Sequence, residues 1–173
     1  MLGGVIGKLL GQQLSLGEIM NIDAGRQERS KDCIVKLVKI FHILKEETLL
    51  SKFKSIFLNK PTLQMYYLVF KFEVKSPNST HIVFIMTNPD YDIVNWKSNL
   101  VKVYCDCKDF MFRSAYLLDK NNTLFINDHI KTSLGQALTT APKENTKTSL
   151  LCKHSFAAVN WLVNNYSSVM KTI

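Results

Sequence analysis

Apolar and polar residues alternate with a period of two from residue 63 onward, the pattern of a strand. One face of this run carries Tyr66, Leu68, Phe70, Phe72 and Val74. A turn at Ser76–Ser79 then leads into a second β-branched and aromatic run between His81 and Thr87. These two runs predict a long antiparallel hairpin, and residues 100–105 predict a third strand. Both faces of the hairpin are apolar near its middle, so we expect other elements to cover each.

A different spacing precedes the hairpin. Apolar residues between 31 and 58 recur mostly at intervals of three and four, which indicates an amphipathic helix with a break at 46–48 and with Ser30 as its N-cap. Pro61 cannot continue a helix, so we expect the helical region, 31–62, to end there. We interpret Cys33 as packed inside this helix and His42 as a surface histidine. The apolar positions are Ile34, Leu37, Val38, Phe41, Leu44, Leu49, Phe53, Ile56 and Phe57.

Residues 1–20 are apolar and rich in glycine, with a spacing that is partly helical. Each glycine lowers helix propensity by up to about 1 kcal/mol, so this segment would be marginal in isolation. It therefore packs on its own domain or inserts into a partner chain, and the sequence leaves both open. Membrane association is a third and least favoured alternative, because the polar face is not especially basic. Residues 21–30 are polar and read as a linker or a helix start.

Two further helices are expected after the third strand. Asp109 is placed to cap a helix through Leu117, and a last helix should run from Ser155 to about Ser167. Between them we expect a turn, a short strand or hairpin arm over 123–130, and an exposed loop over 132–149. The fold class is thus α+β, with N-terminal helices, then a long antiparallel β-hairpin plus a third strand. The proposed division of the chain is 1–30, 31–62 and 63–173.

Candidate chemistry is concentrated in two short segments. Val101, Val103, Cys105 and Cys107 fall at period two, so both thiols should point from one face at a strand end. Cys152 and His154 stand at the start of the last helix, where the helix dipole favours a thiolate. Three thiolates and one imidazole form a complete tetrahedral set for zinc. We expect Cys105, Cys107, Cys152 and His154 to bind one structural Zn²⁺.

The same cysteines and histidine allow other interpretations. Cysteines are often simply small buried apolar residues. A disulfide between Cys152 and Cys105 or Cys107 would leave another thiol orphaned or paired with Cys33, and no secretory signal supports it. Cys152 and His154 could form a nucleophile–base pair, but no third orienting residue accompanies them. His129 could substitute as a ligand, although the set of four is already full.

The words Cys105-Asp-Cys107 and Cys152-Lys-His154, separated by residues 108–151, resemble the SWIM-type zinc finger. Residues 105–113 and 151–154 are similar to a subset of that family encoded by tailed bacteriophages. The resemblance covers roughly residues 63–165, and the long gap implies an insertion. It implies a hairpin feeding the first ligand pair, a helix carrying the second, and a DNA- or protein-binding role. An arginine also occurs at the place of Arg113 in the resembled phage proteins. In this chain we expect Arg113 either to pair with Asp106 or to contact a phosphate, and we favour the structural pairing.

The chain carries an excess of basic residues. The 173 residues contain 22 Lys and Arg against 14 Asp and Glu, a net charge of +8. This favours an acidic partner such as nucleic acid, although no block of like charges appears. No apolar run reaches the roughly 18 residues of a membrane span, and no basic region precedes the apolar N-terminus as in a signal peptide. We therefore expect no membrane partner and a protein of the virion or host cytoplasm that is not secreted.

Two functional hypotheses follow, and neither is an enzyme. No glycine-rich phosphate loop or catalytic triad signature is present, and four protein ligands would close the zinc site. With the resemblance, the first hypothesis is a non-enzymatic, zinc-stabilised structural or assembly protein, a bacteriophage virion component that contacts other protein chains as an oligomer. The alternative is a zinc-finger nucleic-acid-binding protein, with DNA contact supported by the net positive charge.

Overall fold

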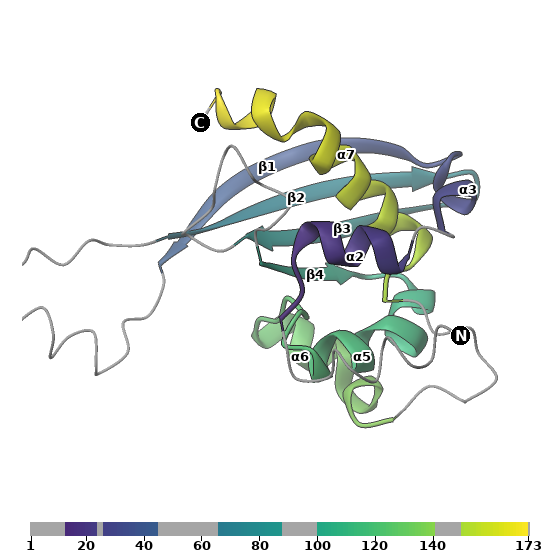
Figure 1. Cartoon of the computed structure of the whole chain (residues 1–173). Coiled ribbons are helices and arrows are strands. Elements are labelled where there is room, and N and C mark those ends of the chain that lie inside the picture. The colour runs from purple at the N-terminus through teal and green to yellow at the C-terminus, as the bar shows by residue number, and fades with distance from the viewer. Residues whose placement is uncertain (1–12, 24–25, 45–65, 88–99, 141–149, 173) are drawn as a thin grey trace, which may run out of the picture.

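The computed structural model describes residues 13–23, 26–44, 66–87, 100–140 and 150–172. Four antiparallel strands form one sheet in the order β1-β2-β3-β4, with helices on both faces (Figure 1). The strands are β1 (Ile34–Leu44), β2 (Tyr66–Ser76), β3 (Ser79–Thr87) and β4 (Val101–Cys105). The helices are α2 (Leu16–Ile22), α3 (Gln27–Ser30), the π-helical η3 (Phe110–Ser114), α5 (Ala115–Lys120), α6 (Asp128–Leu134), the 3-10 turn η4 (Gly135–Leu138) and α7 (Lys153–Met170). The α+β class is confirmed.

The predicted hairpin and third strand are present. In the register, Phe72 lies opposite Val83, and Val83 lies opposite Cys105, so one row of side chains crosses three strands on the same face. The long helix α7 covers this face, and the Phe72 ring meets the Trp161 ring edge-on with centroids 5.5 Å apart. Burying each large apolar side chain here contributes about 1.5–3 kcal/mol. The last helix was correctly predicted, and its packing places its first turn at the end of β4.

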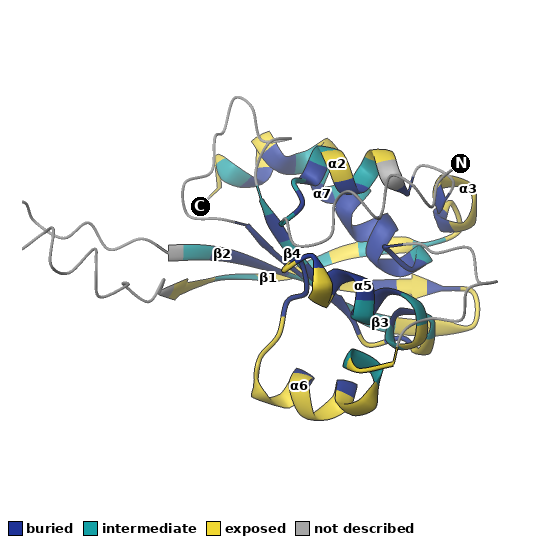
Figure 2. Cartoon of the chain, turned by 60° about the horizontal axis from the view of Figure 1, so that its bottom comes forward, coloured by how far each residue is buried: buried dark blue, intermediate teal, exposed yellow. Residues whose placement is uncertain are grey.

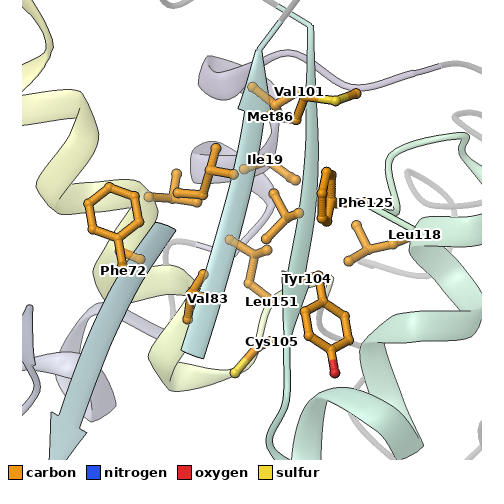
Figure 3. Close-up of a cluster of buried hydrophobic side chains, with 14 of the residues drawn as sticks. Ile19, Phe72, Val83, Met86, Val101, Tyr104, Cys105, Leu118, Phe125 and Leu151 are labelled. Carbon is orange, nitrogen blue, oxygen red and sulfur yellow. The ribbon is translucent and has the colours of Figure 1, made fainter. Parts of the chain in front are cut away.

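The opposite face is covered near β3 and β4 by η3, α5 and the segment after it. Phe84 stacks on Phe125 with centroids 5.4 Å apart, and Tyr104 meets Phe110 edge-on at 5.6 Å. Figure 2 shows α5 and α6 on the side of the sheet away from α2 and α7. Figure 3 shows the two sets of buried side chains on either side of the strands. The expectation that both faces of the hairpin are covered is confirmed.

The helix predicted over 31–62 is wrong for Ile34–Leu44, which form strand β1. The pairing with β2 shifts by one residue between Leu37 and Lys39, leaving Val38 as an extra residue that is 48 % exposed. A β-bulge of this kind adds one residue to a strand. Because of the bulge, the apolar residues of β1 on the face covered by α7 are Val35, Leu37 and Ile40. Their spacing of two and then three resembles the spacing of apolar residues in a helix. Residues 45–62 lie outside the described residues, as does the proposed break at 46–48.

Two cap predictions are also wrong. Ser30 is the last residue of α3 rather than an N-cap, and its hydroxyl donates to the Gln27 carbonyl oxygen at 2.8 Å. Cys33 follows it just before β1, so this cysteine is half-buried at a strand start and not inside a helix. Asp109 makes no side-chain cap, because the chain enters the π-helical turn η3 directly and the Asp109 carboxylate is engaged by arginines.

Part of the apolar N-terminus packs on its own domain. Leu14, Leu16 and Ile19 are each at most 1 % exposed and belong to the main core. Ser15 and Glu18 form a capping box, in which each side chain pairs with the backbone N–H of the other residue at the start of α2. Packing on its own domain, one of the three alternatives for residues 1–20, thus holds for 13–20, and residues 1–12 lie outside the described part.

The outer edge of β4 is paired with two distant segments. The Val101 N–H donates to the Leu14 carbonyl at 3.0 Å, and the Val103 N–H donates to the Thr123 carbonyl at 2.8 Å. Phe125 returns a 3.0 Å hydrogen bond to the Val103 carbonyl, a short bridge where a strand or hairpin arm was expected. These contacts fix β4, and with it the residue that ends it, Cys105.

The loop predicted over 132–149 is wrong for its first residues, which belong to α6 and η4. Asn127 caps α6 by accepting a 2.9 Å hydrogen bond from the Ile130 N–H. Ile130 and Leu134, four residues apart, are both buried and supply the apolar face that the polar composition obscured. Residues 141–149 lie outside the described residues. None of the described helices is both long and apolar enough to span a bilayer.

Candidate metal centre

The structure brings together all four residues that the sequence predicts as metal ligands. Cys105 ends β4, Cys107 follows two residues later, and Cys152 and His154 stand at the start of α7. Their potential ligand atoms all lie within 4.8 Å of one another, and all four residues are buried. A tetrahedral zinc–thiolate site with bonds of about 2.3 Å has sulfur atoms about 3.8 Å apart. The cluster could therefore hold one metal ion with little movement of its side chains.

The first ligand pair is anchored to the neighbouring strand by the residue between the two cysteines. The Asp106 N–H donates to the Ile82 carbonyl at 3.2 Å, and an Asp106 carboxylate oxygen accepts from the Ile82 N–H at 3.2 Å. The same oxygen lies 2.9 Å from Nδ1 of His81. Asp106 faces solvent, so alternation turns Cys105 and Cys107 inward. The exposed aspartate thus fixes the spacing of the two thiols.

The second ligand pair depends on how α7 begins. Cys152 is the N-cap of α7, and its sulfur accepts a 3.3 Å hydrogen bond from the Ser155 N–H. The preceding N–H groups of Leu150 and Leu151 both donate to the buried Asp23 carboxylate. A carboxylate from the N-terminal part of the chain therefore sets the path of the backbone into the helix.

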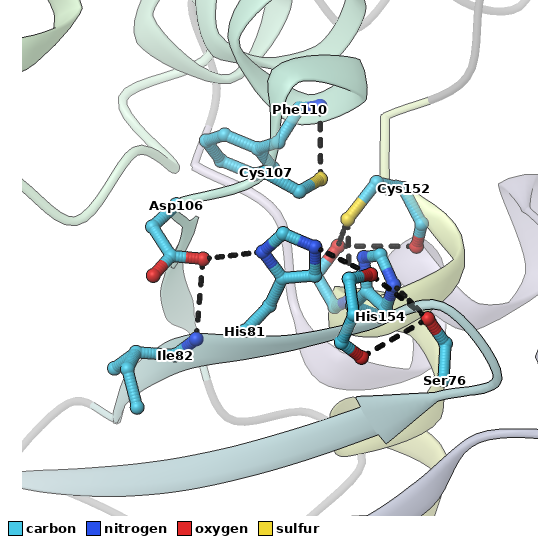
Figure 4. Close-up of polar contacts among 10 residues, drawn as sticks. Ser76, His81, Ile82, Asp106, Cys107, Phe110, Cys152 and His154 are labelled. Carbon is cyan, nitrogen blue, oxygen red and sulfur yellow. Dashed lines mark hydrogen bonds and ion pairs between the residues drawn. The ribbon is translucent and has the colours of Figure 1, made fainter.

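His154 has one nitrogen with a hydrogen-bond partner and one without. Nε2 lies 3.3 Å from the Ser76 hydroxyl in the turn of the β2–β3 hairpin (Figure 4). Nδ1 is buried and has no hydrogen-bond partner among the described residues. A buried polar atom without a partner is costly, and a metal ion would satisfy it. Nε2–H would then donate to Ser76, the usual arrangement around a ligating histidine.

His81 covers the cluster from the side of the hairpin. Its ring centroid is 4.3 Å from that of His154. Both of its nitrogens are engaged, Nδ1 with Asp106 and Nε2 with the Ser79 hydroxyl at 2.9 Å. His81 is therefore positioned as a neighbour of the cluster and not as one of its ligands.

Burial and mutual contacts shift the pKa values of the three thiols in different directions. Burial raises the pKa of Cys105, and its contacts with the other two thiols raise it further. A hydrogen bond with Cys105 lowers the pKa of Cys107, but the contact with Cys152 and burial outweigh this and raise it to about 12. Burial also raises the pKa of Cys152, yet its polar contacts with Cys105, Cys107, His154 and Ser155 bring this pKa well below its usual value. The pocket stabilises one thiolate, and a cation is needed for all three.

The geometry bears on the alternative interpretations of the cysteines, of two histidines and of Arg113. All four cysteines are free thiols, so the disulfide reading receives no support. His42 is exposed on β1, as expected, and His129 is exposed on α6 and does not join the cluster. Arg113 pairs with Asp109, with its Nε 2.8 Å from the carboxylate, and not with Asp106.

Sequence reasoning missed the residues that surround the ligands. Ser76, His81 and Asp23 meet the cluster only through strand pairing and helix packing, and none of the three belongs to a motif with a diagnostic spacing. Asp106 stands inside the first ligand pair, but its contacts with Ile82 and His81 depend on strand pairing. One signal was available for two of them, because a hairpin turn at 76–79 places its own flanking residues beside any site at the end of the third strand.

Comparison with known proteins adds no relative. No protein-family model matches this chain, and neither a curated protein nor a solved structure matches it. The cluster is therefore consistent with a zinc-finger-like site on the geometry alone.

Proposed function

We propose that Cys105, Cys107, Cys152 and His154 bind one Zn²⁺, and that this ion is structural. Its support is the buried set of three thiols and an imidazole with one nitrogen lacking a described partner. Sulfur-rich tetrahedral sets select zinc among the common divalent cations. Four protein ligands leave no open position for substrate, so the protein is proposed to act without catalysing a reaction.

Metal content tests this proposal directly. Native mass spectrometry of the purified chain should show one zinc per chain, and Cys105→Ser should lose it together with thermal stability. Cys33→Ser is the matched control, because it removes a thiol outside the cluster. A folded wild-type protein without metal would overturn the proposal, as would equal zinc loss in both variants.

We further propose that the chain is a structural or assembly protein of a tailed-phage particle. The SWIM-type resemblance of the two ligand words supports this, as does the outer edge of β1, with which no strand in the described part of the chain pairs. Ile34 and Val38 on that strand are 69 % and 48 % exposed, an unusual apolar content for an open edge. Size-exclusion chromatography with light scattering should show a zinc-loaded oligomer, and a strict monomer at all concentrations would contradict self-assembly.

Nucleic-acid binding is the second candidate, and one specific observation favours it. Five basic side chains gather around a cavity beside the proposed zinc site, against a single carboxylate. Binding to a short duplex or single strand by the zinc-loaded monomer would favour this role over assembly.

A further inference from the structure

The surface beside the metal cluster is hollowed into a cavity of about 480 Å³. Cys107 and His154 contribute to its lining, so the cavity opens directly over the cluster. The charged residues that line it are Arg26, Arg29, Lys108, Arg113, Lys153 and Asp109. Its volume lies within the range of roughly 300–1,000 Å³ typical of small-ligand sites.

These basic residues come from three segments of the chain. Arg26 and Arg29 lie at α3, Lys108 and Arg113 lie before and on η3, and Lys153 opens α7. Tertiary packing brings the three segments together, since no block of like charges exists in the sequence. The position of the cavity is thus set by the elements that form the metal cluster.

Asp109 orients two of the five basic side chains. One of its carboxylate oxygens lies 2.8 Å from Nε of Arg113, and the other lies 3.8 Å from a terminal guanidinium nitrogen of Arg26. Arg29, Lys108 and Lys153 form no ion pair with any residue that the structure describes. The cavity therefore combines guanidinium groups in fixed positions with cations that lack a described counter-charge.

The positive charge around the cavity is larger than the negative charge of the neighbouring carboxylate and metal cluster. A zinc ion bound by three thiolates and a neutral imidazole has a net charge of −1, and cations near it stabilise the thiolates. With the Asp109 carboxylate, this offsets two of the five positive charges. About three remain concentrated in a concave surface, where the field of one sign is focused and attracts an anion.

We propose that this cavity binds a phosphate group, with a nucleic-acid backbone as its source. Guanidinium groups match phosphate oxygens with two parallel hydrogen bonds, and lysines add unpaired charge around them. A ligand with one carboxylate carries a single negative charge and would need fewer cations. Successive phosphates of a nucleic-acid backbone carry several charges and would engage several of these side chains. The inference rests on the proposed zinc site only for the inner wall of the cavity.

Fluorescence anisotropy with labelled 20-nucleotide single-stranded and duplex DNA tests the proposal on the zinc-loaded full chain at 50 and 200 mM salt. Arg29→Ala and Lys108→Ala remove exposed cavity cations and should each weaken binding about tenfold. Each should also reduce the slope of log affinity against log salt by about one. Inorganic phosphate at millimolar concentration should compete with DNA for the wild type.

Lys171→Ala is the matched control, since it removes the same charge from an exposed residue beyond the far end of α7. Across an 18-residue helix the two ends lie about 27 Å apart, so binding should change less than twofold. Equal weakening by Lys171→Ala and the cavity variants would overturn the proposal, because only diffuse charge would then matter. Absence of binding to both DNA and phosphate would overturn it too.

The two sources of phosphate and the two proposals remain distinguishable. Binding of inorganic phosphate by isothermal titration calorimetry, without DNA affinity, would support the phosphate site and identify a small phosphorylated ligand as its source. Zinc content is measured in every sample. Zinc without phosphate binding overturns the cavity assignment alone, whereas a zinc-free folded protein that binds DNA at the cavity overturns the zinc proposal alone.

Discussion

The three thiols of the cluster do not share their protons equally. Burial raises the pKa of Cys105, and the balance of thiol contacts and burial raises that of Cys107 to about 12. Burial also raises the pKa of Cys152, but its polar contacts lower this pKa well below its usual value. We therefore expect Cys152 to ionise before Cys105 and Cys107 and to carry the thiolate of the metal-free protein.

Zinc uptake at pH 7.5 should therefore release about two protons from the thiols, not three. The raised folded-state pKa of Cys107 stabilises the metal-free fold below pH 9 and loses this contribution as the pH rises towards 12. Zinc affinity should increase with pH, because zinc binding releases protons and their release is more favourable at a lower proton concentration. Isothermal titration calorimetry in buffers of different ionisation enthalpy measures the number, and a release of three protons would contradict the assignment of Cys152.

Ser76 should affect the zinc affinity of the cluster without being a ligand itself. Ser76→Ala removes the hydroxyl that lies 3.3 Å from Nε2 of His154, so the ring loses the group that fixes its orientation. Zinc affinity should fall about tenfold, as is common for such supporting groups. Competition with a chromogenic chelator measures this, with Ser133→Ala on α6 as a control for loss of a hydroxyl. An unchanged affinity would show that Ser76 does not position the ring.

At the scale of elements, the strand β1 shows where sequence patterns mislead. Five β-branched residues between 34 and 43 favoured a strand, but the bulge at Val38 moved the inward apolar residues out of strict alternation. In contrast, β2 and β3 have no such irregularity in their pairing, and their alternation predicted them correctly. α7 was predictable because its large buried side chains Phe156, Val159, Leu162 and Tyr166 recur at intervals of three and four.

Asp23 links the N-terminal part of the chain to the start of α7. Asp23→Ala leaves the N–H groups of Leu150 and Leu151 without their buried acceptor, so we expect a loss of about 2 kcal/mol in the free energy of unfolding. Zinc affinity should fall as well, because the path into Cys152 is no longer fixed. Urea unfolding measures the first effect.

Asp119→Ala is the control for this change, since Asp119 is exposed at the end of α5, where the helix dipole disfavours a carboxylate. Its stability should be unchanged or slightly higher. An Asp23→Ala protein as stable as the wild type would show that solvent or another group replaces the carboxylate.

For the whole molecule, the metal cluster joins the edge of the sheet to the helix that covers it. Zinc removal by a chelator should lower the melting temperature by about 10 °C, since an ion at 1,000 times its dissociation constant contributes about 4 kcal/mol. The sheet should remain folded, because most of its core lies away from the cluster. Hydrogen exchange should accelerate first at the start of α7 and the end of β4. Uniform acceleration throughout the chain would indicate that metal and fold cannot be separated.

Sequence alone located the four candidate ligands and missed the molecule around them. Cys105 and Cys107 could be found because a two-residue spacing at a strand end turns both thiols inward, and Cys152 and His154 because they open an evident helix. His81 could not be assigned beside them, because its place depends on the register between β3 and β4. The basic cavity depends on packing among α3, η3 and α7, which no local pattern encodes.

The two edges of the sheet are unlike each other. β4 is bordered by Leu14 and by 123–125, whereas β1 pairs only with β2 within the described residues. Growth of a sheet by edge-to-edge addition needs an acceptor edge on both sides of each subunit. A subunit with a single available edge cannot extend a sheet beyond two copies. Once two copies pair through β1, neither has a second available edge with which a third copy could pair. Sheet-mediated association of this protein would stop at a closed pair and would not propagate into a fibre.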